Sequence, residues 1–375
     1  METNWQKMLA PSGTIGTYIW NFFAAVISKP QLFRLHKWCG LFASLLIITQ
    51  AATGAINAFR YEAGQIFDPA GMVRHTQSSD APLSQALRSL RDAHPEKSLE
   101  RIVFPKGPRD ILLAHLLSDA GEKTFASLDP GNAKVLRSGN IWAFPTEAAA
   151  QIHYNLTIGL SGIFIVAVVG VLCLFMATTG FLYWWPRKGQ RAKQLSINWR
   201  APKKLVLRQL HRSTGIIMSV LLSFSLITGL VLAIDYVAGG INATTKNPVG
   251  LSTGAQVDID AIVRQARSQF PDRKIRDVRF VDDTRADIFV LAPERSTRAV
   301  HQVGIDLDSR TIVVTANASA NTELWVTWLP LHSGEFFGSF GLTLIVSNAL
   351  ALFLLAASGP IMWFNRVRLR RTKNL

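Results

Sequence analysis

Four long apolar runs constrain this chain more than any other feature of its sequence. They cover residues 35–59, 156–185, 213–236 and 338–364. A helix needs about 20 apolar residues to cross the hydrocarbon core of a bilayer, and each run reaches that length. No ionised side chain lies in the central part of a run, and Trp184 and Trp363 stand at run ends, where interfacial aromatics gather. The sequence therefore predicts an α-helical membrane protein with four transmembrane helices.

The distribution of charge predicts how these helices are oriented. The formal net charge is +15, but residues 61–151 carry 10 bases against 11 acids and residues 235–330 carry 11 against 12. The excess lies in short segments beside the apolar runs, such as the nine bases from Arg187 to Arg212. This pattern indicates cytoplasmic membrane flanks and excludes a nucleic-acid groove. We expect a multi-pass protein of the bacterial inner membrane, with both termini cytoplasmic and both long polar segments periplasmic.

The predicted organisation follows from these two patterns. Residues 15–27 are apolar but too short to span, which favours an interfacial helix. The predicted segments are a cytoplasmic or interfacial N-terminus (1–30), a first transmembrane helix (31–60), a periplasmic α+β domain (61–151), a second transmembrane helix (152–186), a basic cytoplasmic loop (187–208), a third transmembrane helix (209–236), a second periplasmic α+β domain (237–330), a fourth transmembrane helix (331–365) and a basic cytoplasmic tail (366–375).

The two halves of the chain repeat one another. In the first and third runs a histidine is followed by glycine four and eighteen residues later, and in the second and fourth runs by glycine at +6, +9 and +27. Each polar segment opens with a helix-like stretch, 83–93 or 259–269, followed by four strand-like runs. The sequence predicts two parallel repeats of span, α+β domain and span, related by an axis along the membrane normal. The spaced residues are His36, Gly40 and Gly54; His211, Gly215 and Gly229; His153, Gly159, Gly162 and Gly180; His332, Gly338, Gly341 and Gly359.

Histidine is the residue type that opens all four runs. The repeat would bring His36 near His211 at the cytoplasmic rim, and His153 near His332 at the outer rim. Two neutral imidazoles that face each other across a helix bundle suit the iron of a haem. The sequence therefore predicts two haem sites, with these four histidines as the iron ligands.

The inner haem site has further support from neighbouring residues. At 3.6 residues per turn, positions +4 and +18 return to within about 40° of the histidine's face, so Gly40, Gly54, Gly215 and Gly229 would leave room for a macrocycle. Lys37 and Arg212 directly follow the inner histidines and would pair with haem propionates. Simpler readings exist for each group: interfacial histidines, glycines for helix packing, and positive-inside charges. Zinc is the rival metal, although neither pair has an obvious third protein ligand in the sequence.

These residues carry a family resemblance. The L-H-x-x-x-G…T-G spans, the H-S-G-E-F-F-G stretch from His332 to Gly338, and the turn at Asp129-Pro130-Gly131 resemble the PepSY-associated transmembrane family over residues 30 to 366. Within it, the chain is similar to inner-membrane ferric-siderophore reductases of the ferrioxamine type. That resemblance implies two b-type haems, electron transfer across the membrane and release of iron as Fe(II) from a periplasmic ferric siderophore. A cytoplasmic reductant or a quinol would be the electron donor.

Four more residues are candidates for the substrate region. Glu335 lies three residues after His332 and would orient that imidazole or take up a proton, unless it is a solvated residue of the rim. Trp142, Trp325 and Trp328 precede the outer histidines and would line a chelate site, with an interfacial belt as the simpler interpretation. Two alternative functions stay open: a non-enzymatic PepSY-type binding or regulatory protein, and a siderophore or haem permease. No intramembrane charge or broken-helix pair supports transport.

Overall fold

The computed structural model describes residues 28–185, 189–237, 249–250, 258–320 and 324–371. The interfacial helix predicted over 15–27 lies outside them, as do the first two residues of the predicted basic loop, Arg187 and Lys188. The chain forms two compact units. The helical unit comprises Met1–Ala52, Ile165–Leu230 and Ser347–Leu375, and the sheet unit comprises Thr53–Phe164 and Val231–Val346.

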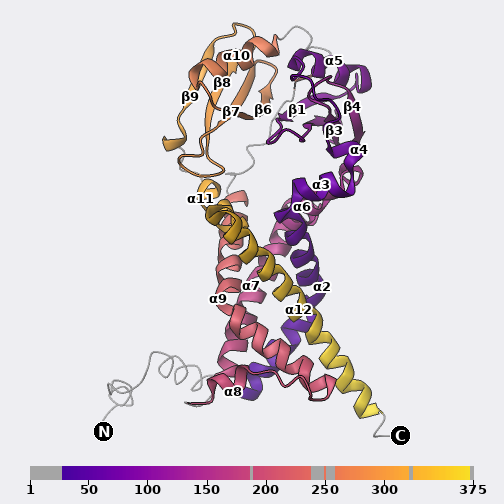
Figure 1. Cartoon of the computed structure of the whole chain (residues 1–375), viewed down its shortest axis with the longest axis vertical. Coiled ribbons are helices and arrows are strands. Elements are labelled where there is room, and N and C mark those ends of the chain that lie inside the picture. Colours follow the sequence, from indigo (N-terminus) through magenta and orange to yellow (C-terminus); the bar gives the residue numbers. More distant parts are fainter. Residues whose placement is uncertain (1–27, 186–188, 238–248, 251–257, 321–323, 372–375) are drawn as a thin grey trace. The chain divides into compact units, whose positions relative to one another are not determined.

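Figure 1 shows the helices and strands in the colours of their order along the chain and labels most of them. The α-helices are α2 (Lys29–Ala58), α3 (Arg60–Phe67), α4 (Pro69–Met72), α5 (Leu83–Ala93), α6 (Pro145–Asn155), α7 (Gly159–Trp184), α8 (Arg191–Leu195), α9 (Lys203–Val237), α10 (Ile259–Gln269), α11 (Leu324–Ser333) and α12 (Gly338–Arg371). The short 3-10 helices are η2 (Ile141–Ala143), η4 (Ala318–Ala320) and η5 (Glu335–Phe337). The strands are β1 (Ser98–Val103), β2 (Leu112–Leu117), β3 (Lys123–Leu128), β4 (Val135–Gly139), β5 (Val249–Gly250), β6 (Ile275–Asp282), β7 (Arg285–Leu291), β8 (Val300–Asp306) and β9 (Ile312–Ala316).

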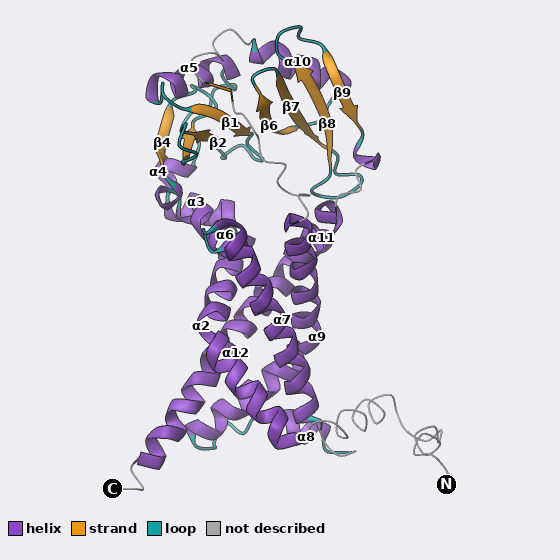
Figure 2. Cartoon of the chain, turned by 180° about the vertical axis from the view of Figure 1, so that it is seen from behind, coloured by secondary structure: helices purple, strands orange, loops and turns teal. Residues whose placement is uncertain are grey.

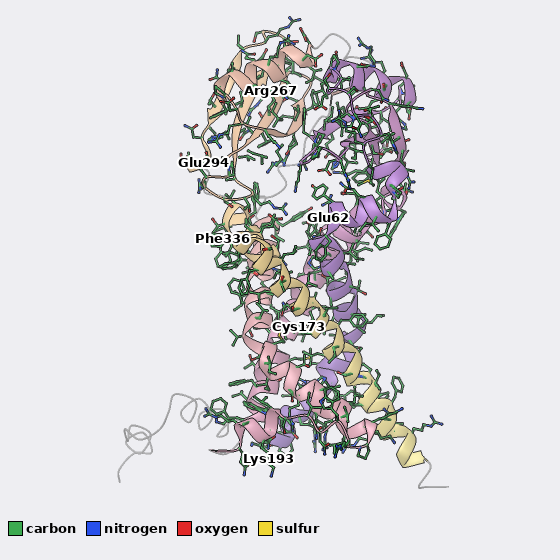
Figure 3. All side chains as sticks on the ribbon, viewed as in Figure 1. Glu62, Cys173, Lys193, Arg267, Glu294 and Phe336 are labelled. Atoms are coloured by element: carbon green, nitrogen blue, oxygen red, sulfur yellow. The ribbon has the colours of Figure 1, made fainter. Side chains whose placement is uncertain are left out.

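Among the described residues, four helical segments are long and apolar enough to cross a membrane, as the sequence predicts. They are α2, α7, α9 and the segment Glu335–Arg368, which includes most of α12. In the helical unit, small and branched side chains from three of these helices form the interior, including Ala43 and Cys173. Figure 3 labels Cys173. Large apolar side chains also point outward, and Phe42 is 84% exposed and Val220 81% exposed. Helices that are apolar on all sides are typical of membrane spans, because lipid accepts the outer face.

A break separates α6 from α7 inside the predicted second transmembrane segment. Leu156, Thr157 and Gly159 all have positive φ, so the helix cannot continue through them. A Cβ on Gly162 would lie 1.6 Å from the carbonyl oxygen of Asn155, so only glycine lets α7 start this close to the end of α6. His153 therefore lies on α6, a short helix of its own, rather than on the spanning helix.

The fourth predicted segment breaks in the same way between α11 and α12. Gly334 and Gly338 have positive φ, and a Cβ on Gly341 would lie 2.0 Å from the carbonyl oxygen of Gly334. His332 thus lies on the short helix α11. The +6 and +9 spacing by itself favours close packing between spans, but in the structure these glycines shape the turn that follows each outer histidine.

One antiparallel sheet dominates the sheet unit (Figure 2). Its strand order is β4-β3-β2-β1-β6-β7-β8-β9, with β5 beside β1. The two polar segments, which we predicted as two domains, each supply four strands of that path, and they join where β1 pairs with β6. In the described part of the chain, three register pairs form this junction: Arg101 with Arg279, Ile102 with Val278, and Val103 with Asp277. The backbone N–H of Phe104 also donates to the carbonyl oxygen of Arg276. A local sequence pattern cannot show such a junction, because the strands are far apart in the chain.

Helices α5 and α10 cover one face of the sheet. Each buries side chains at relative positions 0, +3, +4 and +7, the spacing of one helix face. The carboxylate of Asp260 on α10 accepts hydrogen bonds from the backbone N–H groups of Leu83 and Ser84 and so caps α5, whose N-cap is a proline. The buried residues are Leu83, Ala86, Leu87 and Leu90 on α5 and Ile259, Ile262, Val263 and Ala266 on α10.

His115 on β2 makes the stability of the sheet unit depend on pH. Burial, with Arg101 and Lys123 nearby, holds the pKa of His115 well below 6.5. As the pH falls below about 6.5, the unfolded chain binds a proton that the folded chain does not, so we expect the free energy of unfolding to fall by about 1.4 kcal/mol per pH unit. Denaturant unfolding at several pH values should show this slope. His115→Gln should reduce this slope, the matched variant His75→Gln should keep it, and equal slopes in all three proteins would contradict the prediction.

Candidate functional site

The helical unit brings His36 and His211 together. His36 lies in the second turn of α2 and His211 in the third turn of α9. Their ring centroids are 6.2 Å apart, and the ring planes are nearly perpendicular, at 89°. The sequence predicts this pair from the repeat alone, and the structure places the two imidazoles next to each other.

The spacing of this pair fits a metal held between the two rings. A metal bound by an imidazole nitrogen at about 2 Å lies about 3 Å from the ring centroid, so two imidazoles on opposite sides of one metal have centroids about 6 Å apart. Direct packing of the rings does not require that separation. His36 and His211 would together hold the iron of a haem, which would supply one-electron redox chemistry there.

The hydrogen bonds of both rings fix which nitrogen is protonated. Nδ1 of His36 lies 3.0 Å from the carbonyl oxygen of Met176, which can only accept, so Nδ1 carries the hydrogen. Nδ1 of His211 lies 2.7 Å from Oγ of Ser358, and that hydroxyl donates to the carbonyl oxygen of Leu355. Ser358 therefore accepts from His211. In both rings Nε2 keeps the lone pair that a metal needs, and the second hydrogen bond sets the ring's orientation.

The sheet unit holds the second pair, His153 on α6 and His332 on α11. Their ring centroids are 6.3 Å apart with an interplanar angle of 36°. Nδ1 of His153 lies 3.4 Å from Oγ1 of Thr53. Both pairs therefore have nearly the same separation, although the inner histidines lie on spanning helices and the outer histidines lie on short helices.

A hydroxyl residue followed by glycine supports each of three histidines. A Cβ on Gly54 would lie 2.9 Å from Cε1 of His153, and a Cβ on Gly180 would lie 3.1 Å from Cε1 of His36. At these two positions the glycine lets the ring lie against the partner helix, whereas a Cβ on Gly359 would meet nothing within 4 Å in the described part of the chain. In all three pairs the preceding hydroxyl lies near Nδ1 of the histidine. The sequence contains this signal as Thr or Ser before each glycine, but we did not assign those hydroxyls a role. The pairs are Thr53-Gly54 with His153, Thr179-Gly180 with His36, and Ser358-Gly359 with His211.

The glycines predicted to leave room for a macrocycle are placed differently. Gly54 lies against the His153 ring, a Cβ on Gly40 would lie 3.3 Å from the sulfur of Met176, and a Cβ on Gly215 would lie 3.5 Å from Leu355. Gly229 is half-buried in α9. For the first three, protein side chains occupy the space in front of the glycine.

The two basic residues that follow the inner histidines differ in their contacts. The ammonium group of Lys37 lies 4.3 Å from the ring centroid of Trp38. One terminal nitrogen of Arg212 donates to the carbonyl oxygen of Ser196, while its Nε is buried and has no hydrogen-bond partner among the described residues. An unsatisfied buried donor beside His211 suits an anionic group such as a haem propionate.

The four substrate candidates are spread over the sheet unit. Glu335 forms a two-bond ion pair with Arg298, so the structure gives its carboxylate a partner other than the His332 ring. Trp142 is 60% exposed on η2, and Trp328 is half-buried on α11. Trp325 is half-buried, and the guanidinium of Arg276 lies 5.7 Å from its ring centroid. Among the residues that the structure describes, no group of three or more His, Cys, Asp and Glu side chains is placed to hold a metal ion.

Comparison with known proteins identifies the family. No curated protein matches this sequence. The family model for the PepSY-associated TM region matches residues 33–366, which includes all four spanning segments nearly in full and the whole sheet. The chain is therefore a membrane protein that belongs to the PepSY-associated transmembrane family.

Proposed function

We propose that this protein is an inner-membrane reductase that holds two haem b groups and delivers electrons across the membrane to a periplasmic ferric siderophore. The observation that carries the proposal is the pair of histidine separations, 6.2 Å and 6.3 Å, each equal to the spacing that one shared metal requires. Two such pairs on spanning or adjoining helices suit a chain that moves electrons between two faces of a membrane.

The orientation follows from the positive-inside rule. The basic segments around Arg187–Arg212 and at the C-terminus mark the cytoplasmic side, which makes the sheet unit periplasmic. The matching order of α5 with four strands and α10 with four strands supports two parallel repeats. In this orientation His36 and His211 belong to the cytoplasmic side, and His153 and His332 to the periplasmic side.

The chain's own residues prepare each site for a haem. The Nε2 atoms of His36 and His211 would ligate one iron, and His153 and His332 would ligate the other. Met176 and Ser358 hold the inner imidazoles in the Nδ1–H form and fix the orientation of both rings, which leaves each Nε2 able to bind a metal. Arg212 would pair with a propionate through its buried Nε. The bound haem would supply one-electron redox chemistry.

The substrate step needs one electron for each iron. A quinol or a cytoplasmic reductant provides the electron, Fe(III) in the chelate becomes Fe(II), and no covalent bond of the chelator breaks. Hydroxamate, catecholate and carboxylate oxygens are hard donors that hold Fe(III) tightly, and they bind the larger and less charged Fe(II) far more weakly. Reduction therefore releases the iron and leaves the chelator intact.

The absorption spectrum of the purified protein tests the proposal. Expressed with ample haem and solubilised in detergent, the protein should show a Soret band, and a pyridine haemochrome assay should give two haem b groups per chain. In proteoliposomes, Fe(II) should appear on the sheet-unit side without chelator uptake, which separates the reductase from a permease. A colourless protein would refute the proposal and favour the binding or regulatory alternative.

A further inference from the structure

Three arginines surround one buried carboxylate where β1 pairs with β6. Asp277 is fully buried, and its two carboxylate oxygens accept hydrogen bonds from Arg101 at 3.0 Å, Arg276 at 2.5 Å and Arg279 at 2.8 Å. The three arginine side chains keep between 15% and 28% of their surface exposed. We call these four residues the arginine cluster; it carries three positive charges and one negative charge.

The contacts within the cluster leave part of its positive charge and some of its hydrogen-bond donors unpaired. Arg101 and Arg279 are direct partners across the β1–β6 junction, and like charges in that position destabilise a sheet. Nε of Arg101 and Nη2 of Arg276 are buried and have no hydrogen-bond partner in the described part of the chain. Buried donors without partners are rare in native proteins and cost free energy, so they indicate a missing acceptor.

The neighbouring ion pair shows what a balanced arrangement looks like on the same sheet. Asp287 lies opposite Arg279 in the β6–β7 register, but its oxygens are engaged by Arg285 at 2.8 Å and by the amide of Gln302 at 2.7 Å. One guanidinium and one amide satisfy that carboxylate. Even with this pair included, the group keeps two more cations than carboxylates.

Aromatic rings hold two of the arginines in place. The guanidiniums of Arg276 and Arg279 lie 5.2 Å and 4.6 Å from the ring centroid of Phe289, and Arg276 also lies beside Trp325. These cation–π contacts orient the planar guanidinium groups and leave their positive charge unchanged. Trp325 is a residue that the sequence suggests for a chelate site, and the structure connects it to the cluster.

The same unit carries a second group of cations around Tyr61. Burial raises the pKa of this phenol, yet Lys106, Arg60 and Arg298 together lower it below its usual value. The ammonium group of Lys106 lies 4.2 Å from the ring centroid of Tyr61. A field that stabilises a phenolate also favours other anionic oxygens.

We propose that the arginine cluster binds anionic oxygens of the substrate, so that the protein acts on ferric chelates of net negative charge, of the catecholate or carboxylate class, in preference to neutral hydroxamates. This inference rests on the proposed function, because it names the substrate class of the same reductase. Guanidinium groups bind carboxylate and phenolate oxygens through paired N–H donors, and the three arginine side chains keep 15% to 28% of their surface exposed to a ligand.

Gallium chelates test the proposal without any redox step. Ga(III) takes the place of Fe(III) at the same charge but is not reduced, so binding to the full-length protein can be measured by tryptophan fluorescence whether or not haem is present. A tris-catecholate gallium chelate of charge −3 should bind at least about tenfold more tightly than a neutral tris-hydroxamate chelate. Its affinity should fall as the salt concentration is raised. Equal affinities, or tighter binding of the neutral chelate, would overturn the proposal.

Two variants locate the binding site. Arg279→Gln and Arg101→Gln should each weaken binding of the anionic chelate by about 10- to 100-fold and leave the neutral chelate unaffected. The matched control is Arg273→Gln, which makes the same change of charge in an exposed pair with Glu294 and should bind as the unmodified protein does. Thermal unfolding identifies a variant that fails to fold. In that case the charge preference of the unmodified protein alone decides whether the proposal holds. Reduction of ferric chelates without charge preference refutes this inference alone; charge preference in a protein that never binds haem refutes the proposed function alone.

Discussion

Replacing His211 with alanine should halve the haem content, from two groups per chain to one. Under the proposed function, the substitution would remove one of the two imidazoles that hold the iron, from the pair whose ring centroids are 6.2 Å apart, and a haem held by one histidine only would be lost during purification. His36→Ala should have the same effect, and the double variant should be no worse than either single variant, because both residues serve one site. Pyridine haemochrome analysis, normalised to protein, measures the ratio.

Two comparisons make this experiment decisive. His75→Ala, an exposed histidine in the sheet unit, should keep both haem groups. Free imidazole in the buffer should restore haem binding to His211→Ala by filling the vacated position, which a merely unfolded variant would not allow. The pairing is refuted if the haem ratio is unchanged in both His36→Ala and His211→Ala, or if each variant loses both groups.

Replacing Gly162 with alanine should lower the free energy of unfolding by about 3 kcal/mol or more, which is a large effect for the addition of one methyl group. The added Cβ would lie 1.6 Å from the carbonyl oxygen of Asn155, and backbone cannot give way as a flexible side chain does. The break between α6 and α7 must then open. Because His153 lies two residues before Asn155, we expect loss of the haem that we propose for His153 and His332, together with a lower unfolding temperature.

The control for this prediction lies on the same helix. A Cβ on Gly170 would meet only the end of the Leu230 side chain, at 3.2 Å, and a small rotation of that side chain relieves the contact. Gly170→Ala should therefore keep both haem groups and unfold at nearly the same temperature. Thermal unfolding in detergent and the haem ratio measure both variants; a Gly162→Ala protein indistinguishable from Gly170→Ala would show that α7 tolerates a side chain at the break.

The local patterns of the sequence predict the helices well. Length and hydropathy indicate the four spans, since a bilayer imposes the same requirement on any chain that crosses it. Helices α5 and α10 begin and end at the predicted residues, 83–93 and 259–269. These features depend on neighbours within a few turns, so the sequence contains all the information they need.

The helix breaks after the outer histidines are harder to predict from the sequence. The glycines at +6 and +9 suggested contacts between spans, but Gly162 and Gly341 instead accommodate a carbonyl oxygen of the preceding helix or turn. Spacing shows that a small residue is required and does not show which group approaches it. For the same reason Gly54 was assigned to the face of His36, although its space is filled by the ring of His153.

The sequence by itself determined that this chain has four membrane-spanning segments and a histidine at the start of each predicted span, because hydropathy and spacing are local and periodic. Only the tertiary structure decided the separation of the imidazoles, the hydroxyl and carbonyl groups that hold their Nδ1 atoms, and the three arginines around Asp277. The histidine contacts and the contact of Arg101 with Asp277 join segments that are distant in the chain, whereas Arg276 and Arg279 lie on the same strand as Asp277. Their geometry depends on how whole elements pack, and no local pattern of residues encodes that packing.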